Sequence, residues 1–112
     1  MNIQFRTTGL RNICNDSSRS QRKLGPVCSR KLRTRLDELA AAESLEIMRY
    51  LPQARCHELK GNRNGQLSVD LEHPYRLIFE PAEDPLPIKK DGGLNWKEVK
   101  TIIILDVEDT HG

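Results

Sequence analysis

Three basic side chains lie at the ends of three predicted neighbouring strands. Lys60 ends the first strand, Arg63 lies in the turn that follows, and Arg76 lies near the start of the third strand. Antiparallel pairing would bring these positions together on a small sheet. Clustered cations with few acids nearby suit the binding of a polyanion. The simpler alternatives are solubility for Lys60 and Arg63, and a salt bridge from Arg76 to Asp70 or Glu80.

Short sequence patterns predict three strands and a tight turn in this segment. The strands are predicted at Cys56–Lys60, Gln66–Leu71 and Tyr75–Phe79. Residues 61–65 read Gly-Asn-Arg-Asn-Gly, and Gly and Asn tolerate the positive φ of tight hairpin turns. Apolar and polar residues alternate through the second strand, which is typical of a half-buried strand.

The other elements complete an α+β pattern. A strand is predicted at Asn2–Arg6, and a short helix runs from Thr7 or Thr8 to about Asn15. Asp16-Ser17-Ser18 starts a further helical turn, and Gly25-Pro26 begins the main helix, which runs to about Ala42. The predicted buried stripe of the main helix consists of Cys28, Leu32, Leu36 and Leu39.

A second helical segment and a last strand follow. Ser44 is expected to cap Leu45–Tyr50, which Pro52 ends, and Val99–Val107 reads as a strand that is apolar on both faces. The order predicts one domain, residues 1–112, with an N-terminal strand and two to three helices packed on one face of a small antiparallel sheet.

The composition is that of a soluble globular chain of 112 residues, with 37% apolar and 30% charged residues. Seven basic residues and no acid lie between Ser17 and Leu36, among them Arg30, Lys31, Arg33 and Arg35. These four are expected to be mostly exposed on the main helix, where they could bind RNA phosphates or an acidic protein, or simply be solvated. Three widely spaced cysteines favour a reducing, cytoplasmic location over a disulfide framework.

The segment from Cys56 to Phe79 resembles the RelE/HigB toxins of bacterial toxin–antitoxin systems. The family pattern is close to H-x-L-K-G-x-R-x-G-x-x-S-(I/V), then (W/Y)-R-(L/I)-x-F, and later a D-Y-H ending. The matching residues here are His57, Leu59, Lys60, Gly61, Arg63, Gly65, Ser68, Val69, Tyr75, Arg76, Leu77 and Phe79, with the ending Asp109-Thr110-His111. Thr110 therefore stands where the family has Tyr.

The resemblance implies a RelE-like fold and a toxin that enters the ribosomal A site and cuts mRNA without a metal or cofactor. Cleavage through the 2′-hydroxyl needs a base, positive charge for the phosphorane and an acid for the leaving 5′-oxygen. Arg63 and Arg76 are expected to bind phosphate oxygens, and Lys60 adds a point charge. His111 could transfer a proton, with Asp109 orienting it; His57 is a second candidate.

The resemblance also implies partners: a helix-turn-helix antitoxin of the HigA type, and the 70S ribosome with its mRNA. Thr110 cannot stack on a base as Tyr does, so another hypothesis stays open. This is a non-catalytic or gyrase-poisoning, ParE-like member that acts by protein binding. The three histidines lack metal-ligand spacing, which predicts no metal site. No apolar run is long enough to span a membrane.

Overall fold

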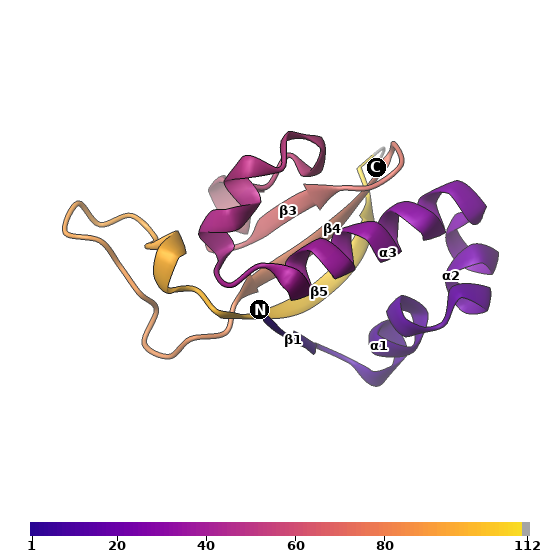
Figure 1. Cartoon of the computed structure of the whole chain (residues 1–112), viewed down its shortest axis with the longest axis horizontal. Helices are drawn as coiled ribbons and strands as arrows, with labels where there is room; N and C mark the ends of the chain where they lie inside the picture. Colours follow the sequence, from indigo (N-terminus) through magenta and orange to yellow (C-terminus); the bar gives the residue numbers. More distant parts are fainter. Residues whose placement is uncertain (111–112) are drawn as a thin grey trace.

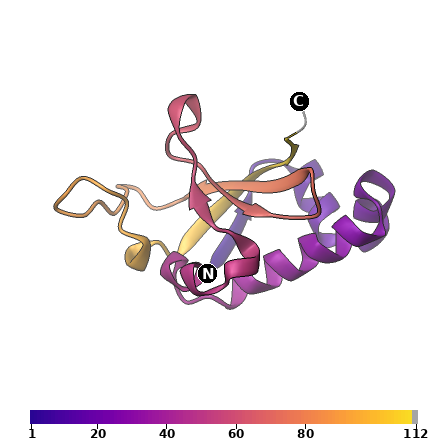
Figure 2. The same ribbon diagram turned by 90° about the horizontal axis from the view of Figure 1, so that it is seen from above.

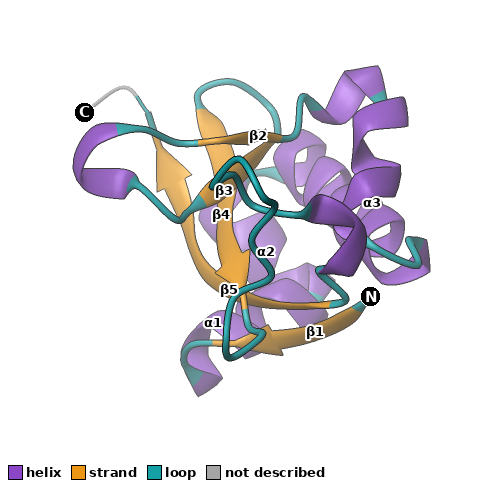
Figure 3. Cartoon of the chain, turned by 90° about the vertical axis from the view of Figure 1, so that its left-hand side faces the viewer, coloured by secondary structure: helices purple, strands orange, loops and turns teal. Residues whose placement is uncertain are grey.

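A five-stranded sheet organises the chain in the computed structural model, which describes residues 1–110. The strands are β1 (Asn2–Phe5), β2 (His57–Glu58), β3 (Leu67–Asp70), β4 (Tyr75–Pro81) and β5 (Thr101–Asp109). Their order across the sheet is β1-β5-β4-β3-β2, and Figure 3 shows β1 and β2 at opposite edges. The α+β class is confirmed, and the sheet is mixed because β1 runs parallel to β5.

The three α-helices lie on one face of this sheet: α1 (Thr8–Asn15), α2 (Ser17–Leu24) and α3 (Pro26–Ala41). The short 3₁₀ helices are η1 (Leu45–Tyr50), η2 (Pro52–Ala54), η3 (Gly61–Arg63) in the loop between β2 and β3, and η4 (Trp96–Glu98). Figure 1 shows α3 crossing the sheet, and Figure 2 shows α3 running below it. The loop between β2 and β3 stands above the sheet, on the face that these helices leave open (Figure 2).

The helix starts follow the predicted caps. Thr7 Oγ1 accepts a hydrogen bond from the Leu10 amide at 3.1 Å, and the Asp16 carboxylate accepts one from the Ser18 amide at 2.9 Å. Both contacts satisfy amides that a helix leaves without partners in its first turn. Pro26 is the first residue of α3, as predicted, where its missing N–H costs nothing.

The N-terminus fixes β1 against the end of α3. The Met1 ammonium donates to the carbonyls of Leu39 at 3.0 Å, Ala40 at 2.8 Å and Ala42. These carbonyls form the negative end of the helix dipole, so a cation there is stabilising. The contact places Asn2 to begin its parallel pairing with Thr101.

The core lies between the helices and the sheet. Cys28, Leu32 and Leu39 of α3 are buried as predicted, whereas Leu36 is only half-buried and packs at the core margin. The sheet contributes six apolar residues that are 0% exposed: Leu67, Val69, Leu77, Phe79, Ile102 and Ile104. The alternation predicted for β3 and β4 therefore points the expected side chains at the helices.

Some predicted boundaries differ from the structure. β2 is shorter than predicted, the following loop contains η3, and Pro52 begins η2 rather than merely ending η1. Ser44 precedes η1 but makes no side-chain capping bond. β5 begins two residues later than predicted because the Glu83 carboxylate accepts from the Lys100 amide at 2.6 Å and the Thr101 amide at 3.0 Å.

A long arm connects β4 to β5. It spans residues 82–95, projects from the body at the left of Figure 1 and is pinned by a bridge between Ile88 and Leu94. Leu86 and Ile88 are 47% and 53% exposed on this arm. Within residues 1–110, no helix combines the length and hydrophobicity needed to cross a bilayer.

Candidate functional site

The predicted cations Arg63 and Arg76 meet on the open face of the sheet. Arg76 on β4 lies opposite Glu108 on β5, and Asp70 on β3 lies opposite Arg76 on its other side. Directly opposed residues of antiparallel strands point to the same face. Tyr75 and Leu77 point to the helix side, so Arg76 points away from the helices.

Arg63 reaches this face from the loop between β2 and β3. Its Nη1 and Nη2 atoms donate to the two Glu108 carboxylate oxygens at 3.2 and 2.7 Å, while its Nε donates to Gln66 at 2.8 Å. This two-point contact between a guanidinium and a carboxylate is the strong, directional form of an ion pair. It links residues 45 positions apart in sequence and anchors the loop to the last strand.

Arg76 is held less tightly by the same carboxylate. Its Nη2 lies 4.0 Å from Glu108 Oε1, which is an ion pair without a hydrogen bond. Its Nε is buried and has no hydrogen-bond partner among the described residues. The salt bridge that the sequence suggested from Arg76 to Asp70 or Glu80 is thus made to Glu108 instead.

The two arginines determine the charge state of Glu108. The hydrogen bonds from Arg63, and then the positive charges of Arg63 and Arg76, hold the pKa of the Glu108 carboxyl below its usual value. The same bonds raise the pKa of Arg63. Glu108 is therefore ionised at neutral pH, and this cluster of three carries one net positive charge.

A pocket of about 320 Å³ opens beside this cluster. It is lined by Arg55, Asp70, Leu71, His73, Pro74, Tyr75, Arg76 and Thr110. Arg55 ends η2 in the left-handed conformation, with φ at 47°, and its guanidinium lies 3.4 Å from the Asp70 carboxylate. Its side chain is 69% exposed, so Arg55 adds an accessible cation to the pocket rim.

Sequence reasoning did not single out Arg55 and His73 as site residues. Arg55 lies outside the motif, and His73 reads as a turn residue before Pro74. A strained backbone at a non-glycine residue is a signal of function that only a structure reveals.

The chain end approaches the same pocket. The Thr110 amide and hydroxyl both donate to the Pro74 carbonyl, at 2.9 and 2.7 Å. Thr110 is therefore anchored to the turn between β3 and β4 and lines the pocket with Arg76. His111 lies outside the described residues.

The remaining predicted residues are spread around this cluster. His57 lies opposite Ser68, on the open face, and its Nδ1 is 2.7 Å from the Arg55 carbonyl. Lys60 is exposed just before η3. Asp109 lies opposite Tyr75, so the register directs it to the helix side and not toward Arg76.

The basic residues of α3 lie on the other side of the sheet from this cluster. Arg30, Lys31 and Arg33 are exposed, and Lys31 pairs with Glu72 at 3.1 Å. The expectation that Arg35 is exposed was wrong. Arg35 is 6% exposed, and its guanidinium donates to the carbonyls of Asp70 and Gln53 and to the Glu38 carboxylate. These internal bonds leave Arg35 buried and unable to contact RNA at the surface.

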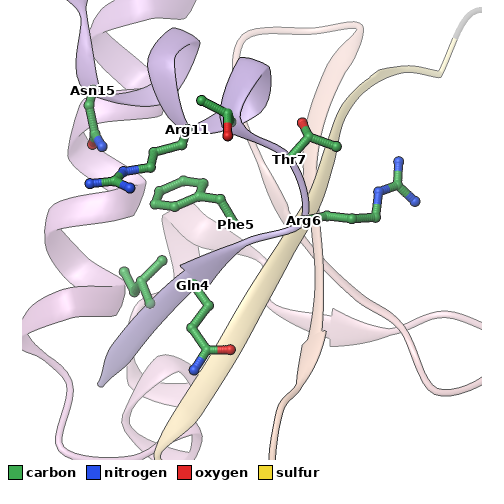
Figure 4. A pocket seen from close by; sticks show the side chains of 8 residues that line it. Gln4, Phe5, Arg6, Thr7, Arg11 and Asn15 are labelled. Atoms are coloured by element: carbon green, nitrogen blue, oxygen red, sulfur yellow. The ribbon is translucent and has the colours of Figure 1, made fainter.

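A second pocket, of about 540 Å³, lies between β1 and α1. Figure 4 shows Gln4, Phe5, Arg6, Thr7, Arg11 and Asn15 around it, and none of the predicted site residues lines it. Arg11 extends alongside Phe5, whereas Arg6 points the other way (Figure 4). This pocket contains two cations but no acid or base that could transfer a proton near neutral pH.

The cysteines are all free. Burial raises the pKa of the Cys14 thiol to about 11 and that of Cys56 to about 12, so neither forms a thiolate at neutral pH. Within residues 1–110, no group of three His, Cys, Asp or Glu side chains is arranged to hold a metal ion.

Comparison with known families agrees with this fold. The sequence profile described as RelE-like toxin of type II toxin-antitoxin system HigB matches residues 3–86. The match includes β1 to β4 with Arg63 and Arg76, and it ends before β5. A search of curated proteins found no match. The profile covers well over half of the 112 residues, and the chain belongs to the HigB-like family of type II toxins.

Proposed function

We propose that this toxin is a ribosome-dependent mRNA endonuclease that cuts at the open face of its sheet. The observation that carries the proposal is a pocket lined by Arg55 and Arg76, with Arg63 next to Arg76 through their shared partner Glu108. The family implies an antitoxin partner. We propose that this antitoxin is a helix-turn-helix protein of the HigA type, and that the toxin acts in the cytoplasm, where ribosomes are.

The arginines would stabilise the pentacoordinate phosphorane. Arg76 makes only a loose ion pair, at 4.0 Å, and its side chain is 28% exposed, so its guanidinium can bind a phosphate. Arg76 and Arg55 line the same pocket, and Arg63 lies next to Arg76 because both arginines pair with Glu108. Positive charge fixed before the reaction stabilises the transition state more than charge that must be reorganised.

His57 is the favoured proton acceptor for the 2′-hydroxyl. A carbonyl can only accept a hydrogen bond, so Nδ1 must donate to Arg55, and the neutral ring then carries its lone pair on Nε2. The 2′-oxygen would attack phosphorus as His57 takes its proton. The bond to the 5′-oxygen then breaks, giving a cyclic 2′,3′-phosphate and a protonated 5′-hydroxyl.

The acid for the leaving oxygen has two candidates. His73 lines the pocket with Arg76, and His111 follows Thr110, which also lines it. Lys60, exposed near the loop, would add long-range attraction for mRNA and rRNA. Asp109 would act only indirectly, because its strand position faces the helices.

The proposal is tested by inducing the toxin without antitoxin and following pulse-labelled protein and DNA synthesis. We expect protein synthesis to stop first in cells with the wild type and to continue in cells with Arg76→Ala at equal protein level. Arrest of DNA synthesis with translation intact would instead support the gyrase-poisoning alternative. Growth without arrest in either case would support a non-catalytic binding protein.

A further inference from the structure

The carboxylate of Glu108 occupies the place that a phosphate would take on Arg63. Two carboxylate oxygens meet two guanidinium nitrogens at 3.2 and 2.7 Å, which is the fork geometry that arginine also offers to phosphate. We infer that Glu108 is an internal competitor of the RNA phosphate, and that substrate binding exchanges this carboxylate for a phosphodiester on Arg63. The inference rests on the proposed function, because it concerns the same site.

Solvent access makes the exchange feasible. The Arg63 side chain is 34% exposed and the Glu108 side chain 26% exposed, so neither is sealed inside the protein. Each partner would regain water or a new ligand when the pair opens. A fully buried pair would lose far more on separation, because each charge would be left without compensation.

Arg76 gives the incoming phosphate its first contact. Its pairing with Glu108 is 4.0 Å long, and its Nε has no partner among the described residues. A phosphate bound there would lie beside the Glu108 carboxylate, and the two negative charges would repel. Asp106, which faces Arg63 from the same strand, adds to this repulsion. The repulsion favours release of Glu108 from Arg63.

The loop between β2 and β3 would move with Arg63. Gly61 begins η3 and Gly65 follows it, with φ values of 67° and 92°, and Arg63 lies between these two glycines. The bond of Arg63 to Gln66 lies within this loop, whereas its bonds to Glu108 tie the loop to β5. Glu108 is thus a positioning residue, which keeps Arg63 folded and lowers the affinity for RNA.

The test measures binding of a fluorescent RNA hexamer with 2′-O-methyl sugars, which cannot be cleaved. Glu108→Gln removes the competing charge, and we expect about tenfold tighter binding. Glu80→Gln is the matched control, because it makes the same change of charge on the same face of the sheet, on the neighbouring strand β4. We expect Glu80→Gln to change the affinity by less than about twofold.

A second set of variants separates this inference from the proposed function. The gain from Glu108→Gln should disappear when Arg63→Ala is added. Equal gains from Glu108→Gln and Glu80→Gln, or no gain from a folded Glu108→Gln protein, would overturn the competitor inference while leaving the RNA site in place. Wild-type affinity that survives both Arg63→Ala and Arg76→Ala would overturn the site itself.

A measurement on the wild type avoids dependence on how Glu108→Gln folds. The Nε–H resonances of Arg63 and Arg76 can be followed by nuclear magnetic resonance during titration with the same hexamer. We expect both resonances to shift. The Arg76 resonance should shift at the same RNA concentration as the Arg63 resonance or at a lower one. An Arg63 resonance that stays unchanged at saturation would overturn the exchange.

Discussion

Arg35 of α3 donates from Nε to the Asp70 carbonyl of β3 at 2.8 Å, and so joins the longest helix to the sheet. The same guanidinium donates to the Gln53 carbonyl at 2.9 Å and to Glu38 at 3.1 Å. One side chain thus fixes three segments behind the open face. Asp70 also lines the pocket beside Arg76, so the bond from Arg35 helps to fix the position of a residue of the site.

Arg35→Ala should destabilise the fold. The change leaves the carbonyls of Asp70 and Gln53 without this donor and removes the cation that balances Glu38. Breaking a buried ion pair from one side costs about 3–5 kcal/mol. Urea unfolding measures the loss, with the exposed Arg33→Ala as control, for which we expect a change within about 0.5 kcal/mol. Equal stability of both variants would contradict the structural role of Arg35.

Glu108 should make the free energy of unfolding depend on pH. Its pKa is lowered in the folded protein, so its contribution is complete above the unfolded pKa, near 4.5, and is lost as pH falls through the folded pKa. The free-energy difference between wild type and Glu108→Gln should be constant above about pH 5 and shrink below about pH 4. Urea unfolding across this range checks the expectation. A difference that does not change with pH would contradict the ion pair with Arg63.

Thr110→Tyr should increase mRNA cleavage about tenfold or more in a translating extract. A tyrosine there would add to the pocket lined by Arg76 an aromatic ring on which a base can stack, worth about 1–3 kcal/mol. Thr110→Val is the control, because it removes the hydroxyl bond to Pro74 without adding a ring. A gain in Thr110→Val equal to that of Thr110→Tyr would mean that release of the chain end, and not stacking, causes the effect.

Adding His111→Ala to Thr110→Tyr tests the last histidine. Loss of the gain would place His111 in the reaction. An undiminished gain would leave His73 as the acid, since it lines the same pocket.

The exposed basic face of α3 should govern the salt dependence of ribosome binding. Arg30→Gln with Arg33→Gln removes two exposed cations of α3, which lies on the other side of the sheet from the Arg63–Arg76 cluster. We expect weaker binding and a shallower dependence on salt, by about one unit of log–log slope for each lost phosphate contact. An unchanged slope would indicate that these residues serve solubility or an acidic antitoxin surface instead.

Local patterns predicted most of the fold. The Gly25-Pro26 helix start, the alternation in β3 and β4, and the helical spacing of Cys28, Leu32 and Leu39 depend on neighbours in sequence, and the structure confirms them. The predicted exposure of Arg35 was wrong, although the same helical spacing indicates that Arg35 is buried. It lies seven residues after Cys28 and four before Leu39, on the buried stripe.

The site was harder to predict because its contacts are distant in sequence. Arg63 and Glu108 meet through the pairing of β3 with β4 and of β4 with β5, and no local pattern specifies these registers. The parallel pairing of β1 with β5 depends in part on the Met1 ammonium reaching the end of α3. The prediction of Asp109 as a site residue depended on motif order alone. Side chains of a strand alternate between its two faces, so Asp109 points to the face opposite that of its neighbour Glu108.

The most direct measurement of the central claim is single-turnover cleavage of end-labelled mRNA on purified, programmed ribosomes. We predict a cut within the A-site codon by wild-type toxin, no cut in the same mRNA without ribosomes, and a rate about 10²–10³-fold lower for Arg76→Ala with unchanged circular dichroism. Cleavage by Arg76→Ala at the wild-type rate, or no cleavage by any folded form, would contradict the assignment of this arginine cluster as an RNA-cleaving site.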